Sequence, residues 1–231
     1  MNDAGAIPVP RDAATVIVIR DPAGSAPSVL MGQRGATAAF MPDSFVFPGG
    51  AVDPGDADVT LLGAINDACA LRLADETPAR IVRALAAAAI RELWEETGLI
   101  FGEAGHWPDA PPGWEGFAAR GLRPSASALR YFFRAVTPPD RSRRFDARFF
   151  MADAANLAAD PDDFSRASGE LSSLQWVPLH AARDFPLPLV TQVALKAAAA
   201  ALPSLEPPAK IPFLRHGAFA YLAGPEGRAA R

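Results

Sequence analysis

The sequence is poor in the residues that build disulfides and zinc sites. Cys69 is the only cysteine, so no disulfide can form within the chain, and the composition suits a reducing compartment. No Cys-His-Asn pattern surrounds Cys69, and we expect a partly buried, inert thiol there. The three histidines are far apart, and no HxxxH or CxxC pattern occurs, which argues against a zinc site.

Basic residues are also fewer than acidic residues. The 22 Lys and Arg residues face 26 Asp and Glu, which gives a formal net charge of −4. Proteins that bind nucleic acid usually carry a basic surplus on one face, so we expect no nucleic-acid partner. A mildly acidic protein that handles an anionic substrate needs local cations, either a few arginines or a metal ion.

Long apolar runs are missing as well. None approaches the roughly 20 residues that cross a bilayer, so we expect no membrane partner. The first ten residues lack the basic and apolar pattern of a signal peptide, and we expect a cytoplasmic protein. Half of the 231 residues are nevertheless hydrophobic, enough for a sizeable core in one elaborated domain.

Patterns of β-branched, apolar and turn residues predict strands and helices along most of the chain. An insertion of mixed, polar composition is expected at 53–77, with a short helix inside 61–73, and a loop at 103–123. Beyond Pro203 prolines favour a loosely ordered tail, which divides the chain into a domain at 10–203 and a tail at 204–231. Strands are expected at Ala14–Arg20, Ser28–Arg34, Phe45–Phe47, Tyr131–Val136, Arg144–Met151 and Leu174–Pro178, and a helix within Pro188–Leu202. Together these elements predict an α/β sandwich with strands of mixed direction.

The strongest helix is predicted at Pro78–Thr97. Thr77 is suited to cap its start, Pro78 to its first position and Gly98 to its C-terminal cap. Within it, Glu92, Glu95 and Glu96 follow the i, i+3, i+4 spacing and project from one side.

Three carboxylates on one side of a helix repel one another, and the dipole disfavours anions in the C-terminal half of a helix. A bound cation would remove this repulsion, and oxygen-only ligands select a hard divalent ion such as Mg²⁺ or Mn²⁺. On spacing alone, a solvated acidic face explains the pattern equally well.

The segment Arg91-Glu92-Leu93-Trp94-Glu95-Glu96-Thr97-Gly98-Leu99 resembles the second half of the Nudix box, Gly-x5-Glu-x7-Arg-Glu-U-x-Glu-Glu-x-Gly-U, where U is apolar. Phe47-Pro48-Gly49-Gly50 resembles the lead into the box, and Asp56 stands where the family has its first Glu. The resemblance covers roughly residues 13–183 and implies a Nudix-like α/β/α sandwich with a mixed β-sheet.

One departure affects the first half of the box. The family pattern separates its Gly and its Arg by 14 positions, whereas Gly50 and Arg91 are 41 apart, so 27 residues are inserted. If the family Glu kept its distance from the Arg, it would fall on Arg83, which is not acidic. The role of Asp56 therefore stays open, whereas the carboxylates of the helix match the pattern.

A split box is itself similar to the coenzyme A diphosphatase branch of the family. The segments that carry this similarity are Phe40-Met41-Pro42, Val46 to Asp53, Thr137-Pro138, and Arg143-Arg144-Phe145-Asp146-Ala147-Arg148-Phe149-Phe150. The last stretch is less widely shared among Nudix proteins and is thus the more specific. We hypothesise that the substrate is coenzyme A or acyl-CoA.

The resemblance also implies roles for the box residues. The metal, Mg²⁺ or Mn²⁺, would be held by Glu92, Glu95 and Glu96 with the carbonyl of Gly50, and Arg91 would orient Glu92 or Glu95 by an ion pair within the helix. Glu92 can accept the proton of the attacking water. Nudix proteins vary in this residue, and a second candidate is Glu170, before the last core strand; an exposed loop glutamate is the alternative.

Three arginines are candidate substrate contacts. Arg143 and Arg144 could grip the 3′-phosphate of coenzyme A, since arginine binds phosphate oxygens in a bidentate way. The alternative is a solvated hairpin tip. Arg34, at the end of the second strand, is similar to an arginine found there in many Nudix proteins.

The resemblance therefore implies a hydrolase, a metal-dependent Nudix pyrophosphatase whose partner is a small nucleotide-derived substrate. Cleavage of coenzyme A would give 3′,5′-ADP and phosphopantetheine. An ADP-ribose or NADH pyrophosphatase is the close alternative. A non-catalytic nucleotide sensor is disfavoured because Arg91, Glu92, Glu95 and Glu96 are all kept. A homodimer, the preferred metal and the leaving group stay open.

Overall fold

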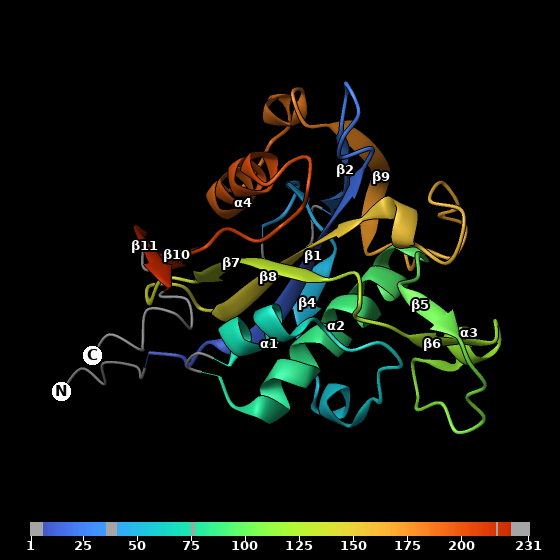
Figure 1. The fold of residues 1–231 in the computed structure, drawn as a ribbon. Coiled ribbons are helices and arrows are strands. Elements are labelled where there is room, and N and C mark those ends of the chain that lie inside the picture. The colour runs from blue at the N-terminus through green and yellow to red at the C-terminus, as the bar shows by residue number, and fades with distance from the viewer. Residues whose placement is uncertain (1–6, 36–40, 75–76, 216, 223–231) are drawn as a thin grey trace.

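A nine-stranded mixed sheet forms the middle of the molecule (Figure 1). The computed structural model describes residues 7–35, 41–74, 77–215 and 217–222. The strand order is β11-β10-β7-β8-β1-β2-β3, with β4 also paired to β1 and β9 to β2. The strands are β1 (Arg11–Arg20), β2 (Ser28–Arg34), β3 (Phe45–Val46), β4 (Gly49–Ala51), β7 (Arg130–Val136), β8 (Phe145–Asp153), β9 (Leu171–Pro178), β10 (Ile211–Arg215) and β11 (Ala218–Leu222).

Strand direction is mixed, as predicted. β1 runs parallel to β8, and β10 runs parallel to β7, whereas β7 and β8 form an antiparallel hairpin. The first half of β1 pairs with β4 and its last two residues pair with β2. β1 therefore carries the Gly49–Ala51 segment, which lies beyond the predicted strand Phe45–Phe47, into the sheet.

Helices cover both faces of the sheet (Figure 1). α1 (Asp67–Leu73) and α2 (Ala79–Thr97) lie on one face and α4 (Leu189–Ala200) on the other. The alternation of β1 supplies both cores: Val16 and Val18 pack on the α2 side, Ile17 and Ile19 on the α4 side. The predicted α/β/α sandwich is confirmed.

The ends of α2 follow the prediction at one end only. Gly98 caps the C-terminus in the left-handed conformation, with φ of 79°. At the other end Pro78 is the N-cap and no side chain caps the helix. The Thr77 hydroxyl instead accepts a hydrogen bond from Arg148 Nη2 at 3.0 Å, because the β8 arginine lies under the start of the helix.

Two segments are more ordered than the sequence indicated. The expected loop at 103–123 holds the hairpin of β5 (Gly102–Ala104) and β6 (Leu122–Pro124) with the short helix α3 (Glu115–Ala118) between them. The expected tail contains β10 and β11, and β10 extends the main sheet. Strand β10 is ordered because it pairs with β7, and its Ile211 and Phe213 side chains are both buried.

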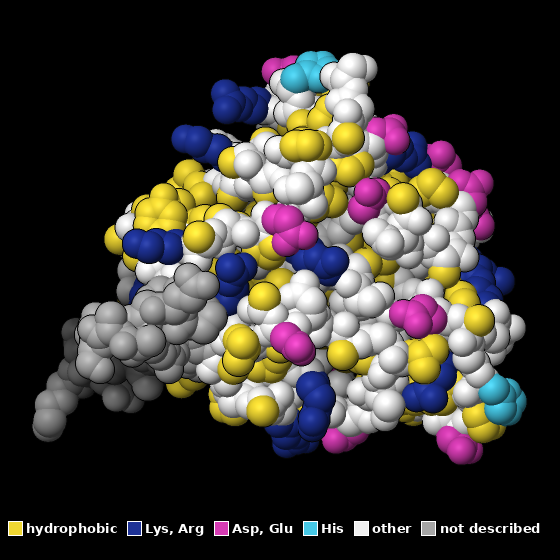
Figure 2. Space-filling view, in the orientation of Figure 1, with side chains coloured by type: hydrophobic (Ala, Val, Ile, Leu, Met, Phe, Trp, Pro, Cys, Tyr) yellow, Lys and Arg dark blue, Asp and Glu magenta, His cyan; other side chains and the backbone are white. Residues whose placement is uncertain are grey.

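Shorter elements complete the chain. The 3₁₀ turns are η1 (Pro54–Asp58), η2 (Ala154–Asn156) and η3 (Ala182–Asp184). η1 and α1 occupy the predicted insertion, and Cys69 on α1 is buried, as expected. In the described part of the chain no helix is long and apolar enough to cross a membrane. Figure 2 shows acidic and basic side chains interspersed over one face.

Candidate active site

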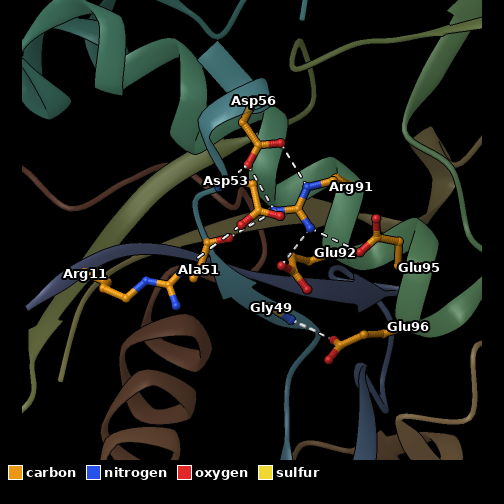
Figure 3. Close-up of polar contacts among 9 residues, drawn as sticks. All are labelled: Arg11, Gly49, Ala51, Asp53, Asp56, Arg91, Glu92, Glu95 and Glu96. Atoms are coloured by element: carbon orange, nitrogen blue, oxygen red, sulfur yellow. Dashed lines mark hydrogen bonds and ion pairs between the residues drawn. The ribbon is translucent and has the colours of Figure 1, made fainter. Parts of the chain in front are cut away.

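The site forms where the last turns of α2 meet the glycine pair of β4. Gly49 N–H donates to Glu96 Oε2 at 2.8 Å, and the Glu92 carboxylate lies against the backbone of Gly50 (Figure 3). A Cβ at Gly50 would collide with that carboxylate and displace it from its present position. The predicted convergence of Gly50 with Glu92 and Glu96 is thus present in the structure.

Exposure differs among the three glutamates. Glu96 is 1% exposed, the Glu92 side chain 13% and the Glu95 side chain 41%. Burial raises the pKa of Glu96 to about 8 and that of Glu92 to about 7. Repulsion between carboxylates acts in the same direction, whereas the Gly49 N–H and the Arg91 guanidinium act against it. Without a bound cation the charged forms of these two glutamates are therefore disfavoured.

Arg91 joins the acidic residues into one network (Figure 3). Its Nη1 donates to Glu92 Oε1 at 2.9 Å and to Glu95 Oε2 at 3.1 Å. Burial opposes the charge of Arg91, but its hydrogen bonds to Asp56 and the surrounding carboxylates outweigh burial and raise its pKa. The predicted orienting contacts of Arg91 with the glutamates are present, and both glutamates are held at once.

Asp56 fills the position that the sequence left open. Arg91 Nε and Nη2 donate to its two oxygens at 2.9 and 3.0 Å, and Asp53 N–H donates to it at 2.8 Å. Asp56 is only 2% exposed. Arg83, which stands at the family spacing, is exposed on α2. The acidic partner of Arg91 is therefore Asp56, despite the inserted residues.

The donor set fits a hard divalent cation by its chemistry. Glu92, Glu95, Glu96 and the Gly50 carbonyl offer only oxygen ligands, which Mg²⁺ and Mn²⁺ prefer. Within the described ranges no three acidic, histidine or cysteine side chains already gather around one point. Arg91 and Gly49 hold the carboxylates in their present positions.

The loop before β9 carries Glu170 beside this cluster. Ser168 N–H donates to the Glu95 carbonyl at 3.0 Å, which fastens the loop to the end of α2. Glu170 itself is exposed, and its charge raises the pKa values of Glu92 and Glu96. The structure thus places the second candidate base named from the sequence beside the glutamates of α2.

The predicted arginines occupy different surroundings. Arg34, half-buried at the end of β2, is close enough to Glu96 for its charge to lower that pKa. Arg143 is exposed at the tip of the β7–β8 hairpin. Arg144 is buried and donates to the carbonyls of Thr137 and Pro8, at 3.2 and 2.6 Å. The structure thus brings Arg34, but not Arg144, next to the carboxylates.

The arginine- and aspartate-containing stretch of β8 is mainly structural. Arg134 of β7 pairs with both oxygens of Asp146 at 2.8 and 2.7 Å, and Arg148 donates to Asp12 of β1. The alternating charges thus cross-link three neighbouring strands. On the other side of β1, Arg11 lies 4.0 Å from Asp53, a contact between residues 42 positions apart that no local pattern indicated.

Comparison with known proteins agrees with this architecture. No family model matches the chain. A curated protein described as putative nudix hydrolase 7 from Caenorhabditis elegans is 30% identical over 161 residues, which is 64% of this chain. The chain matches 46% of that protein, about half its length. The crystal structure of a NUDIX hydrolase from Alicyclobacillus acidocaldarius has a TM-score of 0.62 and 31% identity, over 86% of this chain and 94% of that one. The chain therefore belongs to the Nudix hydrolase family.

Proposed function

We propose that the chain is a metal-dependent pyrophosphohydrolase that cleaves a nucleoside diphosphate linked to another group. The observation that carries this proposal is the acidic end of α2 lying against Gly49 and Gly50 of β4. Arg91 and Asp56 hold this arrangement together. Family membership supports the same reaction class.

The residues present have separable tasks. Glu92, Glu95 and Glu96, with the Gly50 carbonyl, would hold Mg²⁺ or Mn²⁺, which when bound neutralises diphosphate charge and lowers the pKa of bound water. Arg91 keeps Glu92 and Glu95 oriented through one guanidinium nitrogen. Arg34 adds positive charge near Glu96, and we assign it a contact with a phosphate oxygen of the substrate.

A proton acceptor for the attacking water is also needed. We assign this role to Glu92, because its carboxylate lies against Gly50 at the centre of the cluster. Glu170 is the second candidate because the loop carries it to the same cluster. The test compares the pH dependence of kcat in Glu92→Gln and Glu170→Gln. Loss of the acidic limb in only one variant identifies the base.

Coenzyme A or acyl-CoA is the substrate we propose. Water would attack the diphosphate, and the broken P–O–P bond would yield 3′,5′-ADP and phosphopantetheine or its acyl form. Support comes from the split box and the Arg143–Phe150 stretch, which resemble the coenzyme A branch. The alternatives are an ADP-ribose or NADH pyrophosphatase and a non-catalytic nucleotide sensor.

Product analysis discriminates among these functions. The full chain is incubated with Mg²⁺ or Mn²⁺ and with coenzyme A, ADP-ribose, NADH, diadenosine polyphosphates or nucleoside triphosphates, and products are identified by mass. We expect coenzyme A to be cleaved fastest. Cleavage of ADP-ribose alone would overturn the substrate but not the reaction class, and binding without turnover would favour a sensor.

A second experiment tests contact with the 3′-phosphate. Arg143 is exposed and free of the carbonyl contacts that occupy Arg144. Arg143→Ala should weaken coenzyme A binding by about 1.5–3 kcal/mol, the range for a hydrogen bond to a charged group, and leave dephospho-CoA nearly unaffected. Arg141→Ala on the same hairpin is the matched control. Equal losses for both substrates would refute a specific contact.

A further inference from the structure

A cavity of about 230 Å³ lies on the α2 side of the sheet, away from the glutamates. It opens where β7 and β10 end and β8 begins, next to Pro10, the residue that precedes β1. Its lining consists of Pro10, Arg134, Val136, Arg144, Asp146, Phe213 and Arg215. Three arginines against one aspartate give the lining a net charge of +2 in a protein whose total charge is −4.

The cavity is separated from the candidate active site by the width of several strands. One transverse row of paired residues crosses the sheet from Gly50 through Ala14, Arg148 and Arg134 to Phe213. Neighbouring strands are about 4.8 Å apart, so Arg134 and Phe213 lie roughly 14 and 19 Å from Gly50. The cavity is thus separate in space from the site at Gly50.

The arginines of the lining are held in place by the fold. Arg134 donates two hydrogen bonds to Asp146, and its Cζ lies 4.9 Å from the centroid of the Phe213 ring. Arg144 is fixed by two carbonyls through Nε and Nη1. Two of the three guanidiniums are therefore oriented before any ligand arrives, which reduces the entropy that binding would cost.

Donor capacity for an anion remains on two of these side chains. Among the described residues, Nη2 of Arg144 has no hydrogen-bond partner, and the exposed Arg215 side chain at the end of β10 makes neither a hydrogen bond nor an ion pair. Asp146 would repel an anion, but it is engaged by Arg134 and by Arg148, which is 3.3 Å away. The uncompensated charge of the cavity is therefore positive.

We propose that this cavity is a second binding site, independent of the hydrolase centre, for a phosphate group carried by a small ligand. Arg144 and Arg215 would donate to its oxygens, since guanidinium groups match phosphate geometry. The volume suits inorganic phosphate or a phosphomonoester with a short organic substituent rather than a whole dinucleotide.

Calorimetric titration of the full chain tests the proposal. Inorganic phosphate and glycerol 3-phosphate are titrated separately at constant ionic strength in EDTA, which removes metal-dependent binding at the glutamates. We expect saturable binding of at least one ligand, and the tighter of the two identifies the source of the phosphate. Arg215→Ala should weaken it by about tenfold or more, the scale of a hydrogen bond to a charged group.

Two control variants and one variant that disrupts the cavity complete the test. Arg141→Ala removes the same charge from an exposed position outside the cavity and should leave binding unchanged. Glu96→Gln alters the hydrolase centre and should also leave it unchanged. Val136→Glu, which places a carboxylate in the half-buried lining, should abolish binding. Absence of binding by the wild-type chain, equal weakening by Arg141→Ala, or a changed affinity in Glu96→Gln would overturn the proposal.

Discussion

Removing the Asp56 carboxylate would test whether the split box is held together by a buried ion pair. Asp56→Ala removes the acceptor of two Arg91 hydrogen bonds, at 2.9 and 3.0 Å, and of one from Asp53 N–H. The Arg91 side chain is 9% exposed, and its remaining partners are Glu92, Glu95 and the Ala51 carbonyl. A buried guanidinium would thus lose its most buried counter-charge.

The magnitude follows from this burial. Removing one partner of a buried ion pair costs about 3–5 kcal/mol, because the other charge stays desolvated. In a chain of this length about 1 kcal/mol lowers Tm by roughly 2–4 °C, so we expect a fall of about 6–20 °C. Asp53→Ala is the matched control: its side chain is 59% exposed and 3.9 Å from the same arginine. A surface pair contributes about 0–1 kcal/mol, hence at most a few degrees.

The assay is calorimetric unfolding of both variants in EDTA, with urea unfolding to obtain the free energy. Activity with Mg²⁺ should fall as well in Asp56→Ala, because Arg91 then orients Glu92 and Glu95 less firmly. If Asp56→Ala and Asp53→Ala shift Tm equally, or if neither shifts it, then Asp56 is not the buried partner of the box arginine, and our view of the insertion fails.

Three further outcomes are expected. Chelation with EDTA should abolish hydrolysis, and Mg²⁺ or Mn²⁺ should restore it. Glu95→Gln or Glu96→Gln should lower kcat by at least ~10²-fold with the fold intact. Near-normal turnover of both variants would refute the metal assignment. In EDTA the protein should lose stability as pH rises from about 4.5 to 8, because the raised pKa values of Glu92 and Glu96 make the native state bind more protons than the unfolded chain. Glu96→Gln should reduce the pH dependence of the urea midpoint over this window. An unchanged slope of midpoint against pH would contradict the burial argument. Arg144→Ala should lower the urea midpoint clearly more than Arg143→Ala, because only Arg144 bridges two carbonyls; equal midpoints would contradict that contact.

Local patterns in the sequence were enough to predict the central elements. β-branched runs anticipated β1 and β2, and Pro78 and Gly98 anticipated α2 to within one residue at its start. Such patterns reflect burial of one face, which is decided within a few residues along the chain. The placement of Glu92 and Glu96 on one side of α2 needed nothing beyond helical geometry.

Contacts between distant segments were out of reach. The short strand β4 contains glycines that no β-propensity scale favours, and it exists because β1 supplies its hydrogen bonds. Arg144 was interpreted as a phosphate contact because its residue type and position suited one. Its Thr137 partner comes from the β7–β8 hairpin, and its Pro8 partner becomes visible only when β8 lies beside β1.

Because of the insertion, counting residues along the chain does not locate the acidic partner of Arg91, whereas its position in the fold does. Counting back from Arg91 assumes that the family glutamate belongs to the same helix, and that leads to Arg83. Asp56 instead lies in η1, shortly after β4 and at the start of the predicted insertion, where the Asp53 N–H fixes its carboxylate. Those residues therefore lengthen the path between Asp56 and Arg91 without moving either from its partner. The acidic residue of the box is best sought by its distance from the glycine pair, because β4 rather than the helix positions it.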